Sequence, residues 1–308
     1  MSNQRSAISN QQSAIPASRS PSLAPEGFFT LLARVLISLI GWSYFLVSSA
    51  LLFPIALLIW LVTLPFDRNL VVLHLFTCWW AAMYIWMHPG WRLRIEGREK
   101  LPWKGPAILV ANHQSFVDAL VAFALFRPFK PVAKAGVRWV PFIGWNMMFN
   151  RYIALARGER KSIARMAADC RHWLQRGVPV MIYPEGTRST DGQIREFKKG
   201  AFSLAVEENC PVYPVVITGT PDALSKRGAL LGLRASIHAR VLDPVYPTAP
   251  ESVGPTAKDR PRDRATELRD RVREIMVREL GRLRAETAVD LNESVAKTGQ
   301  SPDSNRLP

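Results

Sequence analysis

The stretch from Val35 to Leu64 contains no charged side chain, and it constrains the fold more than any other feature of the sequence. About 20 apolar residues are enough for an α-helix to cross the hydrocarbon core of a bilayer, so this stretch is long enough to do so. Pro54 lies inside it and either kinks one helix or separates two shorter ones. The sequence therefore predicts hydrophobic membrane-anchoring helices over residues 28–90. A buried helical hairpin of a soluble protein is the alternative, but such a long charge-free run is expensive to hide in a soluble domain.

A second apolar run lies within the same region, from Leu70 to Met87. Trp and Tyr side chains crowd its end, and these residues favour the membrane interface. The run is borderline in length, so three placements stay open: it crosses the bilayer, re-enters it, or lies in its interface.

The formal net charge of +15 points to an anionic partner, which is nucleic acid, an anionic membrane surface or a phosphorylated substrate. The sequence contains no helix-turn-helix, zinc-finger or RNA-binding signature, and the apolar region favours the membrane. We therefore expect no nucleic-acid partner. The three cysteines, Cys78, Cys170 and Cys210, are widely spaced without a CxxC pair, so they indicate neither a disulfide framework nor a metal site.

The remainder of the chain divides by composition. Residues 1–27 are rich in Ser, Gln, Pro and Ala, which is typical of a disordered tail. Residues 91–250 alternate short apolar runs with amphipathic segments, which predicts an α/β domain with a mixed, mostly parallel sheet flanked by helices. Residues 251–286 are interpreted as a linker and a charged amphipathic helix, and residues 287–308 as a second disordered tail.

A histidine and an aspartate lie in the turn between a predicted strand and a predicted helix. His113 follows the apolar run that ends at Ala111, and Asp118 precedes a second apolar run. If Ser115 caps the helix, Asp118 falls in its first turn and can fold back onto the imidazole. Such a pair is a general base for a hydroxyl or amine nucleophile. The spacing alone also fits a helix-capping Asp118 beside an ordinary loop histidine, so both interpretations stay open.

A second motif, Glu185-Gly186-Thr187-Arg188-Ser189, also follows a predicted strand. An arginine in a glycine-containing loop suits a phosphate group, through its forked donors and the backbone N–H groups around it. If the two strands are parallel, both motifs lie at the same edge of the sheet. By itself the second motif also fits a surface turn with a salt bridge.

Three motifs together carry a family resemblance. Asn112-His113-x4-Asp118, Glu185-Gly186-Thr187-Arg188-Ser189 and Cys210-Pro211-Val212-Tyr213-Pro214-Val215 resemble the glycerolipid acyltransferase family, in its 1-acyl-sn-glycerol-3-phosphate acyltransferase branch. The resemblance covers roughly residues 90–220. It implies catalytic roles for His113 and Asp118. It also implies phosphate binding by the second motif, residues Glu185, Gly186, Thr187 and Arg188, and a place on the acyl-chain side for Pro211.

One family motif departs from its pattern. The stretch Arg151–Arg157 aligns with it and keeps Arg157, but lacks the glycine, the aromatic and the acidic residue of the pattern. Arg157 is accordingly expected to be a second phosphate ligand, and Arg151 is a substitute for that role. Because of this departure, the sequence does not determine which head group the acceptor carries.

The resemblance implies a membrane-bound O-acyltransferase of phospholipid biosynthesis. The expected donor is acyl-CoA or acyl carrier protein (acyl-ACP). The expected acceptor is a lysophospholipid, 1-acylglycerol 3-phosphate, which would give phosphatidic acid. We expect no metal or other cofactor, a site at the bilayer surface, and a catalytic domain on the cytoplasmic face, as the basic excess indicates. Two alternatives remain: an acyltransferase for glycerol 3-phosphate, another lysophospholipid or a phosphate-free lysolipid, and a non-enzymatic protein that binds anionic membranes.

Overall fold

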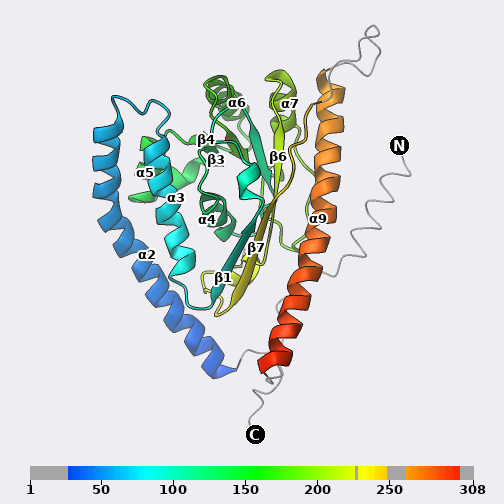
Figure 1. The fold of residues 1–308 in the computed structure, drawn as a ribbon. Helices are drawn as coiled ribbons and strands as arrows, with labels where there is room; N and C mark the ends of the chain where they lie inside the picture. The colour runs from blue at the N-terminus through cyan, green and yellow to red at the C-terminus, as the bar shows by residue number, and fades with distance from the viewer. Residues whose placement is uncertain (1–26, 226–227, 248–260, 299–308) are drawn as a thin grey trace.

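The computed structural model describes residues 27–225, 228–247 and 261–298 (Figure 1). The tail predicted at residues 1–27, except for Gly27, and the linker expected before residue 261 lie outside the described residues. The elements, in chain order, are α2 Phe28–Thr63, α3 Val71–Trp86, β1 Trp91–Glu96, η1 Arg98–Lys100, β2 Ile108–Ala111, α4 Val117–Phe123, β3 Lys130–Lys134, η2 Ala135–Trp139, α5 Ile143–Phe149, β4 Ile153–Leu155, α6 Arg160–Gln175, β5 Val180–Ile182, α7 Gly200–Glu207, β6 Val212–Thr218, α8 Thr220–Ala223, β7 Ala235–Val241 and α9 Pro261–Thr298.

One sheet of seven strands forms the centre, in the order β1-β7-β6-β2-β5-β3-β4. Strands β6, β2, β5, β3 and β4 are parallel to their neighbours in this series, whereas β7 is antiparallel to β6 and parallel to β1. The predicted mixed, mostly parallel sheet is therefore confirmed. Because β2 and β5 are parallel neighbours, the loops that follow them meet at one edge of the sheet.

Different sets of helices pack on the two faces of the sheet. Strand β2 shows how the sequence supplies apolar side chains to both faces. Its side chains alternate: Ile108 and Val110 belong to one hydrophobic cluster, and Leu109 and Ala111 to the other. The first cluster includes the apolar sides of α6, α7 and α9, and the second includes α4 and the end of α3. A strand buried on both faces reads as a continuous apolar run, which is why β2 is recognisable in the sequence.

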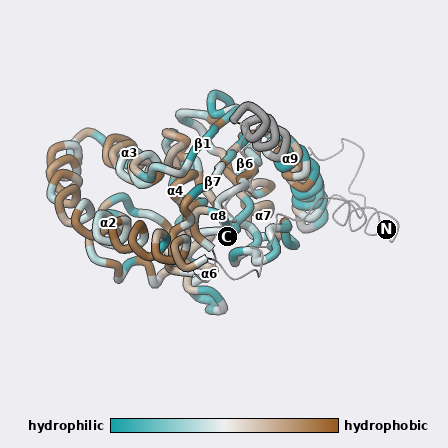
Figure 2. Tube along the Cα trace, turned by 90° about the horizontal axis from the view of Figure 1, so that it is seen from below, coloured by the Kyte–Doolittle hydropathy of each residue, from teal (hydrophilic) through white to brown (hydrophobic). Residues whose placement is uncertain are grey.

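The charge-free stretch forms a single helix, α2, so of the two arrangements considered for Pro54 the undivided helix is found. The helix changes direction along its length in Figure 1, and Pro54 supplies a cause, because it has no N–H to donate to the carbonyl one turn before it. By length and composition α2 is able to cross a membrane, and 11% of its most apolar window is buried. Many of its residues are coloured as hydrophobic in Figure 2, and exposed ones include Leu39, Ile40 and Leu51.

The second apolar run forms α3, which has 16 residues and is shorter than a typical membrane span. Leu73 and Trp80 of α3 pack with Ala56 of α2 in a separate hydrophobic cluster. A polar group joins α3 to α5, since Thr77 Oγ1 accepts hydrogen bonds from Asn146 Nδ2 at 3.0 Å and Asn150 Nδ2 at 3.1 Å. Thus α3 lies between α2 and the sheet domain and fastens the apolar helix to it (Figure 1).

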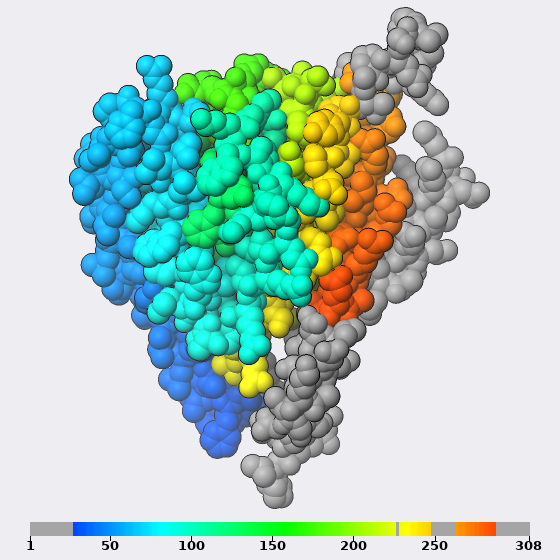
Figure 3. Space-filling model, viewed as in Figure 1, coloured from blue at the N-terminus to red at the C-terminus, as the bar shows by residue number. Residues whose placement is uncertain are grey.

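The charged helix α9 covers the opposite side of the molecule from α2, as Figures 1 and 3 show. Leu268, Val272, Leu280 and Leu283 of α9 are at most 2% exposed and belong to the cluster on the first face of the sheet. The helix continues to Thr298, past residue 286, where the composition predicts its end.

Strand β3 was not predicted from the sequence. Its residues Lys130 and Pro131 belong to a basic, proline-punctuated stretch that lacks the usual strand pattern. The Lys130 side chain is nonetheless 1% exposed, donates to Asn150 O at 2.8 Å and lies over the Trp173 ring at 4.5 Å. Burial lowers the pKa of Lys130 to about 7. An internal strand therefore lies in a stretch where charged residues and proline interrupt the apolar pattern expected of a buried strand.

Candidate active site

His113 and Asp118 form a hydrogen-bonded pair at the end of β2. His113 follows the strand, Asp118 is in the first turn of α4, and 2.8 Å separates His113 Nδ1 from Asp118 Oδ2. The predicted N-cap is wrong by one residue, because α4 begins at Val117 and Phe116 is its N-cap. Ser115 still contributes to the turn, since its Oγ accepts the Val117 N–H at 3.2 Å. Since Nδ1 donates to the carboxylate, the free nitrogen of the neutral ring is Nε2, which is the nitrogen able to accept a proton. The geometry agrees with the folded-back His–Asp pair that the sequence predicts.

The carboxylate of Asp118 is surrounded by donors. Its side chain is 0% exposed, and Oδ2 also accepts the N–H groups of Gln114 at 2.6 Å and Ser115 at 2.8 Å. The hydroxyl of Thr220 donates to Oδ1. An ionised carboxylate has only acceptor sites, so these four donors suit the charged form that would support an imidazolium.

Sequence reasoning missed Thr220 and the part played by Asn112. Asn112 Nδ2 donates to Ile217 O at 2.8 Å, and Ile217 N donates to Asn112 Oδ1 at 2.8 Å. These two hydrogen bonds connect the turn after β2 to the end of β6. They thereby place Thr220, which follows β6, next to Asp118. Thr220 lies 102 positions after Asp118, so no local spacing reveals the contact.

Tyr183 was also missed, although it lies just before the second motif. Its ring stacks on the His113 imidazole, with centroids 4.2 Å apart and planes 26° apart. Its hydroxyl is buried and has no hydrogen-bond partner within the described part of the chain. Burial raises the pKa of Tyr183 well above the usual value, and the negative charge of Asp118 adds to the effect. Tyr183 therefore limits the positions that the imidazole ring can take.

The second motif lies against the first, as expected for loops after parallel neighbours. Glu185 is 5% exposed; its Oε1 accepts the His113 N–H at 2.9 Å and its Oε2 accepts the Arg195 N–H at 3.2 Å. The Ser189 N–H donates to His113 O at 2.7 Å. Burial raises the pKa of Glu185 to about 7, against the effect of the two N–H donors. Glu185 thus joins the two motifs through backbone groups.

The arginines of the predicted phosphate site lie at the same edge of the sheet but are not equivalent. Gly186 has φ +69°, a left-handed backbone conformation that favours glycine. Arg188, two residues later, is half-buried. Arg157 is exposed and follows β4, which is three strands away from β2, or about 14 Å at the usual strand spacing. Arg188 is therefore much closer along the sheet edge to the His–Asp pair.

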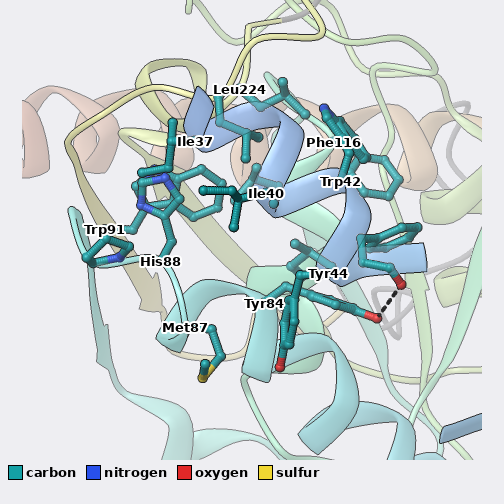
Figure 4. A pocket seen from close by; sticks show the side chains of 16 residues that line it. Ile37, Ile40, Trp42, Tyr44, Tyr84, Met87, His88, Trp91, Phe116 and Leu224 are labelled. Carbon is teal, nitrogen blue, oxygen red and sulfur yellow. Dashed lines mark hydrogen bonds between the residues drawn. The ribbon is translucent and has the colours of Figure 1, made fainter. Parts of the chain in front are cut away.

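Two cavities lie beside this edge. An apolar cavity of about 220 Å³ is lined by α2, α3, α4 and the segment around Leu224, and it reaches Phe116 and Val117, where the turn after β2 meets α4 (Figure 4). A polar cavity of about 330 Å³ lies between η2, α5 and α6. Its charged lining residues are Lys134, Arg138, Arg165 and Asp169. One cavity therefore suits a hydrocarbon chain and the other an anionic group.

Pro211 occupies a different place from the other predicted residues. It precedes β6 and its carbonyl accepts the Ile108 N–H at 3.0 Å, at the beginning of β2, whereas His113 follows the end of β2. Pro211 is absent from the lining of the apolar cavity. The structure therefore does not bring Pro211 together with the His–Asp pair, and its place on the acyl-chain side stays a prediction.

The described residues also bear on metal binding. Within residues 27–225, 228–247 and 261–298, no group of three or more His, Cys, Asp or Glu side chains is arranged to hold a metal ion. His113 and Asp118 bind each other instead, with the remaining carboxylate contacts made by protein donors.

Comparison with known proteins agrees with these motifs. Residues 92–218 match the family model described as Acyltransferase. A 1-acyl-sn-glycerol-3-phosphate acyltransferase of Chlamydomonas reinhardtii is 37% identical over 193 residues, which cover 62% of this chain and 57% of the relative. The enzyme of the same name from Pseudomonas aeruginosa is 33% identical over 143 residues, covering 44% of this chain and 54% of the relative. The chain thus spans a little over half the length of these two relatives.

A solved structure shares the fold. The crystal structure of a 1-acyl-sn-glycerophosphate acyltransferase from Thermotoga maritima has a TM-score of 0.65 and 22% sequence identity, and the match covers 83% of this chain and 98% of that chain. The resemblance to the glycerolipid acyltransferases that the three motifs predicted is confirmed over the matched residues.

Proposed function

We propose that this chain, which carries an acyltransferase domain at residues 92–218, transfers a fatty acyl group from a thioester to the free hydroxyl of a lysophospholipid. The proposed acceptor is 1-acylglycerol 3-phosphate, and the product is phosphatidic acid, in phospholipid biosynthesis. The observation that carries the proposal is the His113–Asp118 pair, joined through Glu185 to the arginine loop. The names of the relatives support this choice of acceptor.

The catalytic step follows from the orientation of His113. Its Nε2 takes the proton from the acceptor hydroxyl while Asp118, bonded to Nδ1, stabilises the positive charge on the ring. The hydroxyl oxygen attacks the thioester carbonyl, and a tetrahedral intermediate forms. The carbon–sulfur bond then breaks, and the departing thiolate takes the proton from Nε2. The products are the ester and the free thiol, and His113 returns to its starting state.

Binding of the acceptor phosphate places its hydroxyl at His113. Arg188 is the proposed phosphate ligand because it lies in the loop that Glu185 fastens to the His113 backbone. Arg157, farther along the sheet edge, is a second ligand. Holding both reactants in place replaces a bimolecular encounter by a local one, which lowers the entropic barrier. The proposed reaction forms one carbon–oxygen bond, breaks one carbon–sulfur bond and moves one proton through His113, so it uses the acyl donor, acyl-CoA or acyl-ACP, as co-substrate and includes no metal.

The membrane supplies the lipid and receives the product. The exposed apolar surface of α2 is the proposed anchor, and the apolar cavity beside Phe116 opens between this helix and the catalytic turn. Basic residues near an anionic bilayer surface contribute about 1 kcal/mol each, so the excess of positive charge favours a domain on the cytoplasmic face.

The decisive test is acyl transfer by membranes that contain the protein. Wild type should transfer a labelled acyl group to 1-acylglycerol 3-phosphate, and His113→Ala should abolish transfer at an equal protein level. A panel of glycerol 3-phosphate, other lysophospholipids and phosphate-free lysolipids identifies the acceptor. Near-normal transfer by His113→Ala would overturn the mechanism. Liposome binding without transfer to any acceptor would instead support a membrane-binding protein.

A further inference from the structure

The C-terminal helix α9 makes direct contact with the loop that contains Arg188. Arg273 of α9 donates from Nε to Arg195 O and from Nη2 to Ile194 O, both at 3.0 Å. Arg284, farther along the same helix, donates from Nη2 to Gly192 O at 2.6 Å. These contacts come from outside the residues that match the acyltransferase family, which end at residue 218.

The same loop is bonded to the catalytic turn on its other side. Gly192 O accepts a second hydrogen bond, from Gln114 Nε2 at 3.0 Å, and Gln114 is the residue that follows His113. The Arg195 N–H donates to Glu185, which also accepts the His113 N–H. A single carbonyl, that of Gly192, is therefore shared by the neighbour of His113 and by α9.

We propose that Arg284 is a positioning residue, through which α9 holds the loop of residues 186–195 so that Arg188 meets the acceptor phosphate beside His113. The proposal rests on the proposed function for the identity of the acceptor. The loop forms neither helix nor strand over these residues, so its path depends on contacts with neighbouring segments, which include the bond from the Ser189 N–H to His113 O and the contacts from α9. Arg284 is not placed in contact with the substrate.

The burial of Arg284 distinguishes it from an ordinary surface arginine. The residue is 9% exposed, and its Nε and Nη1 are buried without a hydrogen-bond partner within the described part of the chain. Burial lowers the pKa of Arg284, and the charge of Asp191 opposes this effect. A buried cation with unpartnered donors contributes little net stability. What the side chain does provide is a fixed donor for Gly192 O.

The helix itself is firmly attached on both sides of Arg284. Leu280 and Leu283 are at most 1% exposed and pack in the hydrophobic cluster on the sheet. Arg240 of β7 contacts Glu279 at 2.5 Å and Glu286 at 2.7 Å. Arg284 therefore belongs to a helix that is fixed to the sheet. A residue that positions a loop must itself be held in this way.

The test compares Arg284→Met with Arg282→Met, in the full-length chain. Arg282 is on the same helix, but its side chain is 73% exposed and contacts Glu279 at 3.5 Å, so its loss should leave the loop unchanged. Arg284→Lys keeps one donor for one acceptor and should behave as wild type. Arg273→Met removes the contacts to residues 194 and 195 and gives a second disrupting variant if Arg284→Met does not fold.

Two measurements are made on each variant. Hydrogen–deuterium exchange of peptides from residues 186–195 should be about tenfold faster in Arg284→Met, and unchanged in Arg284→Lys and Arg282→Met. The KM for the lysophospholipid should rise about tenfold in Arg284→Met, while the KM for the acyl donor stays constant. A purely structural role would change both KM values or the thermal midpoint instead.

The outcomes separate the two proposals. Equal loop exchange in Arg284→Met and Arg282→Met, or an equal rise in both KM values, would overturn the positioning role. If wild type transfers no acyl group to any lysolipid, the proposed function fails. The exchange comparison then still decides whether α9 holds the loop, because it does not depend on turnover.

Discussion

The turn after β2 and the loop after β5 lie side by side at one edge of the sheet, yet they are built differently. In the turn, Asp118 is fully buried and accepts hydrogen bonds from four donors that belong to the turn and to α8. In the loop, Arg188 is half-buried, and the segment that carries it is held by Glu185 and by α9. Three of the four donors to Asp118 thus belong to its own turn, whereas the loop also depends on contacts with the His113 backbone and with α9.

This difference agrees with the function proposed for each region, which is proton transfer for the turn and phosphate binding for the loop. A general base must keep one nitrogen aimed at the reacting hydroxyl, and small errors in direction reduce the rate strongly. A phosphate ligand must stay accessible to a lipid that arrives and leaves. The comparison therefore predicts that changes in the turn lower kcat, whereas changes in the loop raise the KM of the acceptor.

The largest effect is expected from Asp118→Asn. The neutral amide removes the negative charge that stabilises the imidazolium. Its NH2 group must also replace one of the two acceptor oxygens, Oδ2 with His113, Gln114 and Ser115 as donors or Oδ1 with Thr220 as donor. We expect kcat to fall about a thousandfold or more, by analogy with the loss of the orienting aspartate in other histidine-based catalysts. Steady-state acyl transfer with a saturating acceptor measures this. A matched loss of thermal stability would show that folding, and not ring orientation, had been affected, so the melting curve is the control.

Arg188→Glu should have the next largest effect, and on the other parameter. Reversing the charge removes a charge-assisted bond to the phosphate and adds repulsion, so the acceptor KM should rise about a hundredfold. Arg157→Glu should raise it less, because Arg157 is exposed and follows β4, which lies about 14 Å from β2 along the sheet edge. Kinetics with each substrate varied in turn check both variants. A change confined to the donor KM would contradict the division between turn and loop.

Thr220→Val should lower kcat about tenfold, since it removes one of the hydrogen bonds to a charged group. Thr220→Ser keeps the hydroxyl and is the matched control, which should stay near wild type. An unchanged kcat in Thr220→Val would mean that Thr220 does not help to orient Asp118.

The sequence predicted the parts of this site that depend on local spacing. His113 and Asp118 lie five positions apart, so a turn followed by a helix start allowed the pair, although the spacing alone also fitted a capping aspartate beside a loop histidine. The apolar runs identified β2, β5 and β6, because parallel strands buried on both faces lack polar alternation. An anchoring helix was predicted from the charge-free apolar run, and α2 has the length and the exposed apolar surface that this prediction requires.

Contacts between distant segments were beyond such reasoning. Thr220 reaches Asp118 across 102 positions, and Arg284 reaches Gly192 across 92. Both depend on the order of strands and on the docking of α9, which periodicity does not encode. Strand β3 was missed because Pro131 and its basic neighbours hide the pattern of a buried strand. The backbone role of Glu185 likewise required the neighbouring loop to be in place.

The smallest effect is expected at Tyr183, where the two regions touch. Its ring stacks on His113 at 4.2 Å, but its buried hydroxyl has no partner in the described residues. Tyr183→Phe keeps the ring and removes the unpartnered group, so the protein should gain about 1 kcal/mol of stability and keep its kcat. Tyr183→Ala removes the stacking partner and should lower both. Thermal unfolding and steady-state kinetics on the two variants separate ring from hydroxyl. A large loss of kcat in Tyr183→Phe would instead show that the Tyr183 hydroxyl takes part in the reaction and that the residue does more than support the turn.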